Sequence, residues 1–226
     1  IQSLGIVLLP RMSSVLAVGD RGRAESYLSD SFWLSTVMSI GLLAGIAGVS
    51  REFVPLFFGV GFEECELLLP ILALIMPACA VSSVVGNQFL IPMERDSLYL
   101  KSVLVGATVN IALCLLLIPP LAARGAAVAT VAAEYVVAGV QVWFARREIP
   151  VGRYLRELSP FVAFGIAEYA CMKAAAFTGL SGAALLAAEV VVGVTVFVGL
   201  GLGCLVIRGD CRLRLFGLSR FVKQKG

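Results

Sequence analysis

Ionisable side chains stand inside long apolar stretches of this sequence. Glu134 is the only charge in the stretch 125–145, and Glu168, Lys173 and Glu189 interrupt two later apolar stretches. A charged side chain at the bilayer centre costs roughly 2.5–3.5 kcal/mol on insertion scales, so such groups face a bundle interior or water and pair with one another. The chemistry open to them is charge pairing, proton exchange or ion passage.

Three of these residues fall on one predicted hairpin. Stretches 158–177 and 181–207 are separated by a short turn near residue 179, and reflecting Glu189 through that turn places it level with the segment between Glu168 and Lys173. We therefore expect an intramembrane charge pair in the outer half of the hairpin. A pair that only fixes helix register, or a Lys173 side chain that extends outward to the interface, would also fit this spacing.

Glu134 has no basic neighbour in its own stretch. It could be protonated, hydrogen-bonded to Asn110 or Gln141, or part of an ion pathway. Asn87 and Gln88 are also polar groups in an apolar stretch, and they could line a pathway or bond across helices.

Arg11 follows Pro10 inside the first apolar stretch. Its side chain could extend to the membrane interface. It could instead point into a cavity and hold a phosphate, for which the guanidinium fork is suited. The residues that could contact a transported substrate are thus Arg11, Asn87, Gln88, Asn110 and Glu134.

Bond-making chemistry has little support in the sequence. There is no histidine, none of the six cysteines forms a CxxC pair, and no Walker A loop occurs. A His-based proton relay, a His metal site and a Ser-His catalytic pair are therefore excluded within this chain. We predict that the protein is not an enzyme, has no catalytic residues and needs no metal or cofactor.

The elements that carry these residues are apolar stretches long enough to cross a bilayer. About 20 helical residues span a hydrocarbon core of about 30 Å, and 59% of this chain is hydrophobic. We predict an all-α, polytopic bundle of about seven spanning helices over residues 1–207, followed by a basic cytoplasmic tail, 208–226. The stretches are 4–18, 31–50, 67–93, 102–123, 125–145, 158–177 and 181–207.

Basic residues are distributed unevenly between the gaps. Fifteen of the 18 Lys and Arg residues fall on alternate gaps, and only Arg51, Arg124 and Lys173 fall on the others. An excess of Lys and Arg marks the cytoplasmic side. This predicts a cytoplasmic carboxyl terminus and an outward-facing 63–66 loop. The net charge of +3 describes a membrane rim and gives no indication of nucleic-acid binding.

The order of elements predicts part of a larger transporter. The sequence begins with Ile1 close to an apolar stretch, and an odd number of spans places that end outside. We expect a preceding amino-terminal lobe as a partner of this one. Pro70 and Pro77 together predict a bent third helix, because each internal proline removes a backbone hydrogen bond.

Five landmarks, in order, resemble polysaccharide flippases of the Wzx type. The first resembles their "LPR-x-S…G-D" segment, the second "FG…F", the third "Q-x-LIP", the fourth "N…L-I-P" and the fifth "GAA-x-AT-x-x-x-E". Here they are Leu8–Ser14 with Gly19-Asp20, Phe57–Gly59 with Phe62, Gln88–Pro92, Asn110 with Leu117–Pro119, and Gly125–Glu134.

This resemblance implies membership of the multidrug/oligosaccharidyl-lipid/polysaccharide exporter superfamily, whose members have two six-helix lobes around a central cavity. It implies a flippase of the bacterial inner membrane that moves lipid-linked oligosaccharides for polysaccharide biosynthesis, and this chain resembles most of the carboxyl-terminal half. Bilayer lipids and a polysaccharide polymerase are the implied partners. Two alternatives stay open: a cation-coupled multidrug or small-molecule exporter of the same fold, and a non-transporting membrane scaffold.

Overall fold

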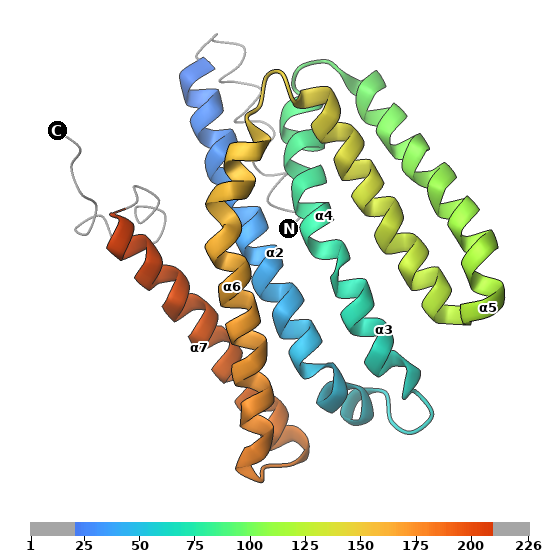
Figure 1. Ribbon diagram of the computed structural model, residues 1–226, viewed down its shortest axis with the longest axis vertical. Helices are drawn as coiled ribbons and strands as arrows, with labels where there is room; N and C mark the ends of the chain where they lie inside the picture. The colour runs from blue at the N-terminus through green and yellow to red at the C-terminus, as the bar shows by residue number, and fades with distance from the viewer. Residues whose placement is uncertain (1–20, 210–226) are drawn as a thin grey trace.

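The computed structural model describes residues 21–209, and its regular elements in that range are all helices (Figure 1). The predicted all-α class is therefore confirmed. The first predicted stretch, 4–18, and all but the start of the tail lie outside the described residues. The elements are α2 (Arg21–Phe57), α3 (Glu64–Ala73), α4 (Ile75–Ser82), the π-helix η1 (Ser83–Leu90), α5 (Asp96–Ala145), α6 (Val151–Ala175), the 3-10 turn η2 (Ala176–Thr178) and α7 (Gly182–Arg208).

Helix α5 contains a sharp reversal and forms two antiparallel arms, residues 96–121 and 123–145 (Figure 1). The chain turns at Ala122, whose φ of 47° and ψ of −126° are non-helical. Pro119 and Pro120 precede this point, and each lacks the N–H that a continuing helix would use. Two predicted stretches are thus joined directly at the ends that are predicted to face outward.

Within residues 21–209, four helical segments are long and apolar enough to cross a membrane: Glu25–Phe57, Glu64–Leu90, Asp96–Ala145 and Gly182–Arg208. Helix α6, which carries Glu168 and Lys173, is not among these four. The six predicted stretches within the described range are largely helical, but the predicted number of seven spans is not confirmed.

The third predicted stretch is interrupted, as its prolines suggested. Helix α3 ends at Ala73 and α4 begins at Ile75, with Leu74 between them. Pro77 lies in the first turn of α4 and has no N–H to offer the carbonyl of Ala73, which would be its partner in a continuous helix. The π-helix that follows α4 was not predicted.

Helix α2 lies at the centre of the bundle, with α6 and α7 on one side and α3 and α4 on the other, while α5 packs outside α3 and α4 (Figure 1). Aromatic side chains form much of the contact between α2 and α6. Phe32 lies 5.3 Å from Tyr154 between ring centroids, and Trp33 meets Phe161 edge to face at 5.5 Å. These two ring contacts fix the position of α6 along the axis of α2.

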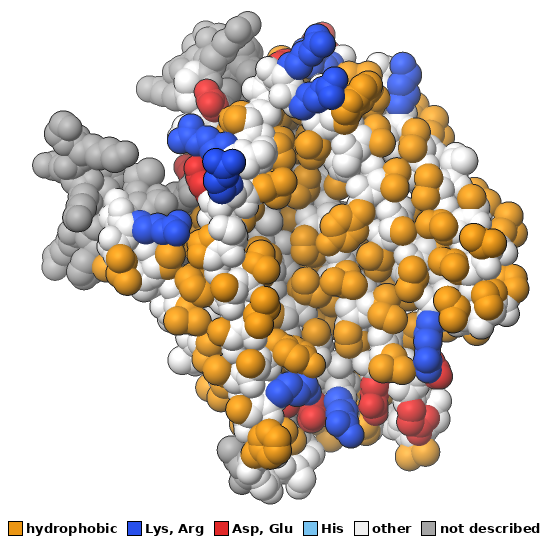
Figure 2. All heavy atoms as spheres, in the orientation of Figure 1, with side chains coloured by type: hydrophobic (Ala, Val, Ile, Leu, Met, Phe, Trp, Pro, Cys, Tyr) orange, Lys and Arg blue, Asp and Glu red, His pale blue; other side chains and the backbone are white. Residues whose placement is uncertain are grey.

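Charged side chains gather at the two ends of the bundle, and apolar side chains cover the band between them (Figure 2). Large apolar side chains in this band are exposed, including Leu115 at 75% and Val191 at 64%. Such a belt is what a lipid-facing surface requires. Because successive helices run antiparallel, the predicted cytoplasmic gaps lie at one end and the predicted outer gaps at the other (Figure 1).

The predicted orientation can be tested by labelling. In a cysteine-free background, a cysteine at Glu64 should react with an impermeant maleimide in intact cells, and one at Arg153 should not. Both side chains are well exposed, at 64% and 76%, so reactivity will report sidedness. Permeabilised cells should label both positions. Labelling of Arg153 but not Glu64 in intact cells would reverse the orientation.

Candidate functional site

A charge cluster at the predicted outer end, made of Glu52, Lys173 and Glu189, joins α2, α6 and α7. The ammonium of Lys173 lies 3.4 Å from a carboxylate oxygen of Glu52 and 3.9 Å from one of Glu189. The Glu189 side chain is fully buried, and its carboxyl group also interacts with that of Glu52. One ammonium therefore serves two carboxylates.

The α6–α7 hairpin brings two of these residues together. Gly179 has a φ of 78°, a left-handed conformation that suits glycine, and it ends η2 so that α7 can return along α6. Glu189 thereby lies beside Lys173, close to the level that the predicted turn implied. The predicted pair used Glu168 as well, but within the described residues no ion pair joins Glu168 to Lys173.

Glu52 was missed because the sequence analysis assigned residues 51–66 to the outer gap. Helix α2 instead continues to Phe57, which carries Glu52 into the bundle. A signal was present, since Gly45, Gly48 and Glu52 follow one another at helical spacing and lie on one face. That face contacts α6 and α7.

Glu168 occupies a different position from the cluster. Its side chain is 3% exposed, and its Oε2 has no hydrogen-bond partner among the described residues. Two glycines make room for the carboxyl group: a Cβ at Gly45 would lie 3.5 Å from its Oε1, and one at Gly193 would lie 3.3 Å away. A carboxyl group is thus held between α2 and α7 with no cation assigned to it.

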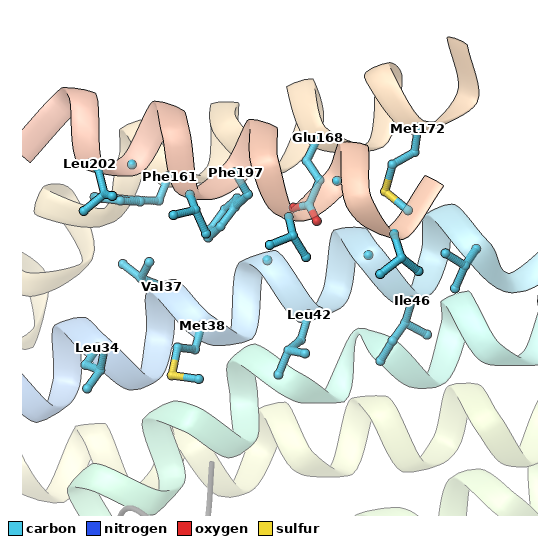
Figure 3. Close-up of a pocket in the computed structure, with 18 of the residues that line it drawn as sticks. Leu34, Val37, Met38, Leu42, Ile46, Phe161, Glu168, Met172, Phe197 and Leu202 are labelled. Atoms are coloured by element: carbon cyan, nitrogen blue, oxygen red, sulfur yellow. The ribbon is translucent and has the colours of Figure 1, made fainter. Parts of the chain in front are cut away.

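This carboxyl group lies at a groove between α2, α6 and α7, with a volume of about 570 Å³ (Figure 3). Gly41 helps to form it, because the ring of Phe197 approaches to within 2.9 Å of where its Cβ would be. Glu168 is the only ionisable residue among those lining the groove. The apolar walls include Val37, Leu42, Ile46, Phe161, Val194 and Phe197.

Glu134 has a different partner from the two predicted. The thiol of Cys79 in α4 donates to its Oε2 over 3.7 Å. The second arm of α5 presents Glu134 to α4, so the side chain meets Cys79, whereas Asn110 accepts a hydrogen bond within its own helix. Glu134 is half-buried and lies away from the groove.

Two buried glutamine side chains, Gln141 and Gln88, lie toward the other end of the bundle. Gln141 donates through Nε2 to the hydroxyl of Ser102 over 3.1 Å, linking the two arms of α5. Gln88 in η1 is fully buried, and neither end of its amide has a partner among the described residues. Asn87 beside it is half-buried.

The candidate substrate contacts are therefore not gathered at one place. Asn87, Gln88, Asn110 and Glu134 lie on η1 and α5, and none of them lines the groove. Arg11 lies outside the described residues.

Ion pairs explain two exceptions to the charge asymmetry. Arg124 pairs with Glu64 at 2.8 Å, and Lys173 pairs with Glu52. Two of the three basic residues at the predicted outer end are thus each accompanied by a carboxylate. Among the described residues, groups of three or more His, Cys, Asp or Glu side chains able to hold a metal do not occur.

Comparisons with known proteins give a consistent result. Residues 1–207 match the protein family described as Lipid II flippase MurJ. No curated protein matches the sequence. A solved structure described as "Lipid II flippase MurJ, inward closed conformation" resembles this one with a TM-score of 0.72 at 14% sequence identity, covering 89% of this chain and 42% of that one.

The structural likeness concerns the fold, because the sequences are only 14% identical, and the chain spans less than half the length of that structure. The family match is independent of it and covers every described helix except the last residue of α7. Together they assign a multi-pass membrane protein with a transporter fold, in a family of transporters rather than enzymes. The chain belongs to the MurJ lipid II flippase family.

Proposed function

We propose that the protein moves a lipid-linked cell-envelope precursor across the bacterial inner membrane. The observation that carries this proposal is the family match over residues 1–207. The family's description makes lipid II the first substrate to test. A lipid-linked polysaccharide precursor, which the five sequence landmarks favour, has the same general chemistry of an apolar chain and a polar headgroup.

The chain is proposed to act as one lobe with a second lobe completing the cavity. Residues 1–207 would form the membrane bundle and residues 208–226 a basic cytoplasmic tail. The solved structure is more than twice as long as the part this chain matches, which supports a further lobe. The distribution of Lys and Arg supports the cytoplasmic tail, and a polymerase at the outer face remains a proposed partner.

A complementation experiment tests this function. Bacteria depleted of their own lipid II flippase should regain growth when they express the full-length protein, and new lipid II should again become accessible at the outer face. Bacteria lacking a polysaccharide precursor flippase provide the parallel test for the second substrate. If the protein assembles in the membrane and rescues neither strain, the scaffold alternative is favoured.

Arg11 is proposed to contact the anionic headgroup. It is set in an apolar stretch near the predicted cytoplasmic side, where the precursor would load. In the full-length protein, Arg11→Ala should lower precursor transport about tenfold or more, because a hydrogen bond to a charged group contributes about 1.5–3 kcal/mol. Arg11→Lys should rescue only in part, since lysine lacks the fork. If Arg11→Ala transports normally at equal abundance, the Arg11 side chain only extends to the membrane interface and does not bind the headgroup.

A further inference from the structure

We propose that the charge cluster is a proton-binding site, in which Glu52 and Glu189 share one proton at neutral pH and Lys173 balances the remaining negative charge. This site is separate from the headgroup contact proposed for Arg11. The inference does not depend on which precursor is transported.

The cluster contains two acidic groups and one basic group. The ammonium of Lys173 contacts both acids, at 3.4 Å from an oxygen of Glu52 and 3.9 Å from one of Glu189. One ammonium balances one carboxylate, so ionisation of both acids would leave a negative charge without a counter-charge. Binding a single proton makes the cluster neutral.

Burial makes that excess charge costly. The Glu189 side chain is fully buried, and the Glu52 side chain is only 15% exposed. Both lie where α2 packs against α6 and α7, so water solvates them poorly. Two carboxyl groups that share such a site do not both ionise at neutral pH, because each charge disfavours the other and burial disfavours both.

The contact between the two carboxyl groups indicates where the proton lies. The carboxyl group of Glu189 interacts with that of Glu52 as well as with the ammonium. Two carboxylates have no hydrogen to place between them and repel each other, whereas a protonated carboxyl group donates a hydrogen bond to a carboxylate. The proton therefore belongs to the pair and not to either residue alone.

The other titratable groups of the packed helices, within the described residues, leave this balance unchanged. Glu168 lies further into the bundle on α6 and is itself acidic, while Arg51 of α2 is exposed. Helix α3 packs against α2 and carries Glu64 and Glu66, and Glu64 pairs with Arg124. Two further groups on α6 are exposed, Tyr169 and Cys171.

The proton can exchange with the predicted outer side. The end of α2 and the turn between α6 and α7 lie at the same end of the bundle (Figure 1), and the Lys173 side chain is 32% exposed there. Because the folded protein keeps a proton that the unfolded chain has released at neutral pH, its stability should fall as the pH rises. Loss of the proton leaves excess negative charge between α2 and the α6–α7 hairpin.

Infrared spectroscopy of the full-length protein at neutral pH tests the proposal. Protonated carboxyl groups have a carbonyl stretching band that ionised carboxylates lack, and maltoside micelles contribute no carbonyl band of their own. Glu52→Gln and Glu189→Gln should each lower this band by the amount of one carboxyl group, and the double variant should lower it by the same amount, because one proton is shared. Lys173→Met should raise the band by one carboxyl group, since a second proton must then replace the ammonium.

Glu64→Gln is the matched control, because Glu64 has its own arginine and should be ionised, so the band should not change. Where Glu189→Gln folds poorly, Glu52→Gln makes the same test. The pH dependence of unfolding adds an independent measurement: the unfolding equilibrium constant of wild type should rise by up to about tenfold per pH unit, the effect of one proton, and this rise should be smaller in Glu52→Gln.

Two results would overturn the proposal. If neither Glu52→Gln nor Glu189→Gln lowers the band, both acids are ionised and the cluster holds no proton. If the double variant lowers the band by twice the amount of each single variant, each acid carries its own proton and none is shared.

Discussion

Replacing Lys173 by Ala is expected to lower the free energy of unfolding by about 2–3 kcal/mol, somewhat less than the roughly 3–5 kcal/mol lost when one partner of a fully buried ion pair is removed. The substitution leaves Glu52 and Glu189 facing each other without their shared ammonium. The effect is reduced because the Lys173 side chain is 32% exposed and partly solvated. Reversible unfolding of the purified protein in mixed detergent micelles measures the change.

A double-mutant cycle isolates the pair. Adding Glu189→Ala to Lys173→Ala removes one stranded carboxylate and should recover part of the loss, giving a coupling energy of about 0.5 kcal/mol or more. Arg153→Ala is the matched control, because Arg153 forms an exposed pair with Glu157 that is worth about 0.3–0.5 kcal/mol. If the effects of the two changes are strictly additive, the Lys173–Glu189 contact does not contribute to stability.

Replacing Gly125 by Ala is the second change with a large expected effect. Gly125 is buried just after the reversal in α5, and a Cβ there would overlap the backbone carbonyl of Leu117 in the other arm. Backbone cannot move aside as a flexible side chain can. We expect a loss of about 1–3 kcal/mol in the free energy of unfolding, the usual cost of overpacking.

Gly139→Ala is the matched control in the same arm. A Cβ at Gly139 would meet no atom within 4 Å, so the change should be neutral or stabilising by up to about 0.5–1 kcal/mol, the helix preference of Ala over Gly. Unfolding in the same micelles compares the two variants directly. Equal stability of both would contradict the close approach of the two arms.

The positions of the helices could be predicted from the sequence because their signals are local. Runs of apolar residues and the unequal distribution of Lys and Arg depend only on neighbouring residues and on the bilayer. The helix ends were harder to predict. Helix α2 continues beyond Arg51 to Phe57, because packing against α6 and α7 stabilises the segment. From its composition, this segment was predicted to be a connection between helices.

Contacts between distant residues could be predicted only where a short turn fixed the geometry. The α6–α7 turn placed Glu189 beside Lys173, but no such constraint related Glu52 to them, because 121 residues separate it from Lys173. The partner of Glu134 could not be predicted for the same reason, since Cys79 lies on another helix. The sequence also has two glycine pairs at GxxxG spacing, Gly41 with Gly45 and Gly199 with Gly203. A Cβ at Gly41 or Gly45 would meet α7 or α6, whereas a Cβ at Gly199 or Gly203 would meet no atom within 4 Å, and spacing alone does not distinguish the two pairs.

Translocation in reconstituted vesicles tests the central claim most directly. The purified full-length protein is placed in vesicles with lipid II carrying a fluorescent headgroup, and an impermeant quencher added outside reports how much headgroup remains on the inner leaflet. The account predicts that protein-containing vesicles exchange lipid II between leaflets much faster than protein-free vesicles, and that Arg11→Ala slows this exchange. If folded, inserted protein leaves both lipid II and a lipid-linked polysaccharide precursor as static as in protein-free vesicles, the proposed flippase function is contradicted.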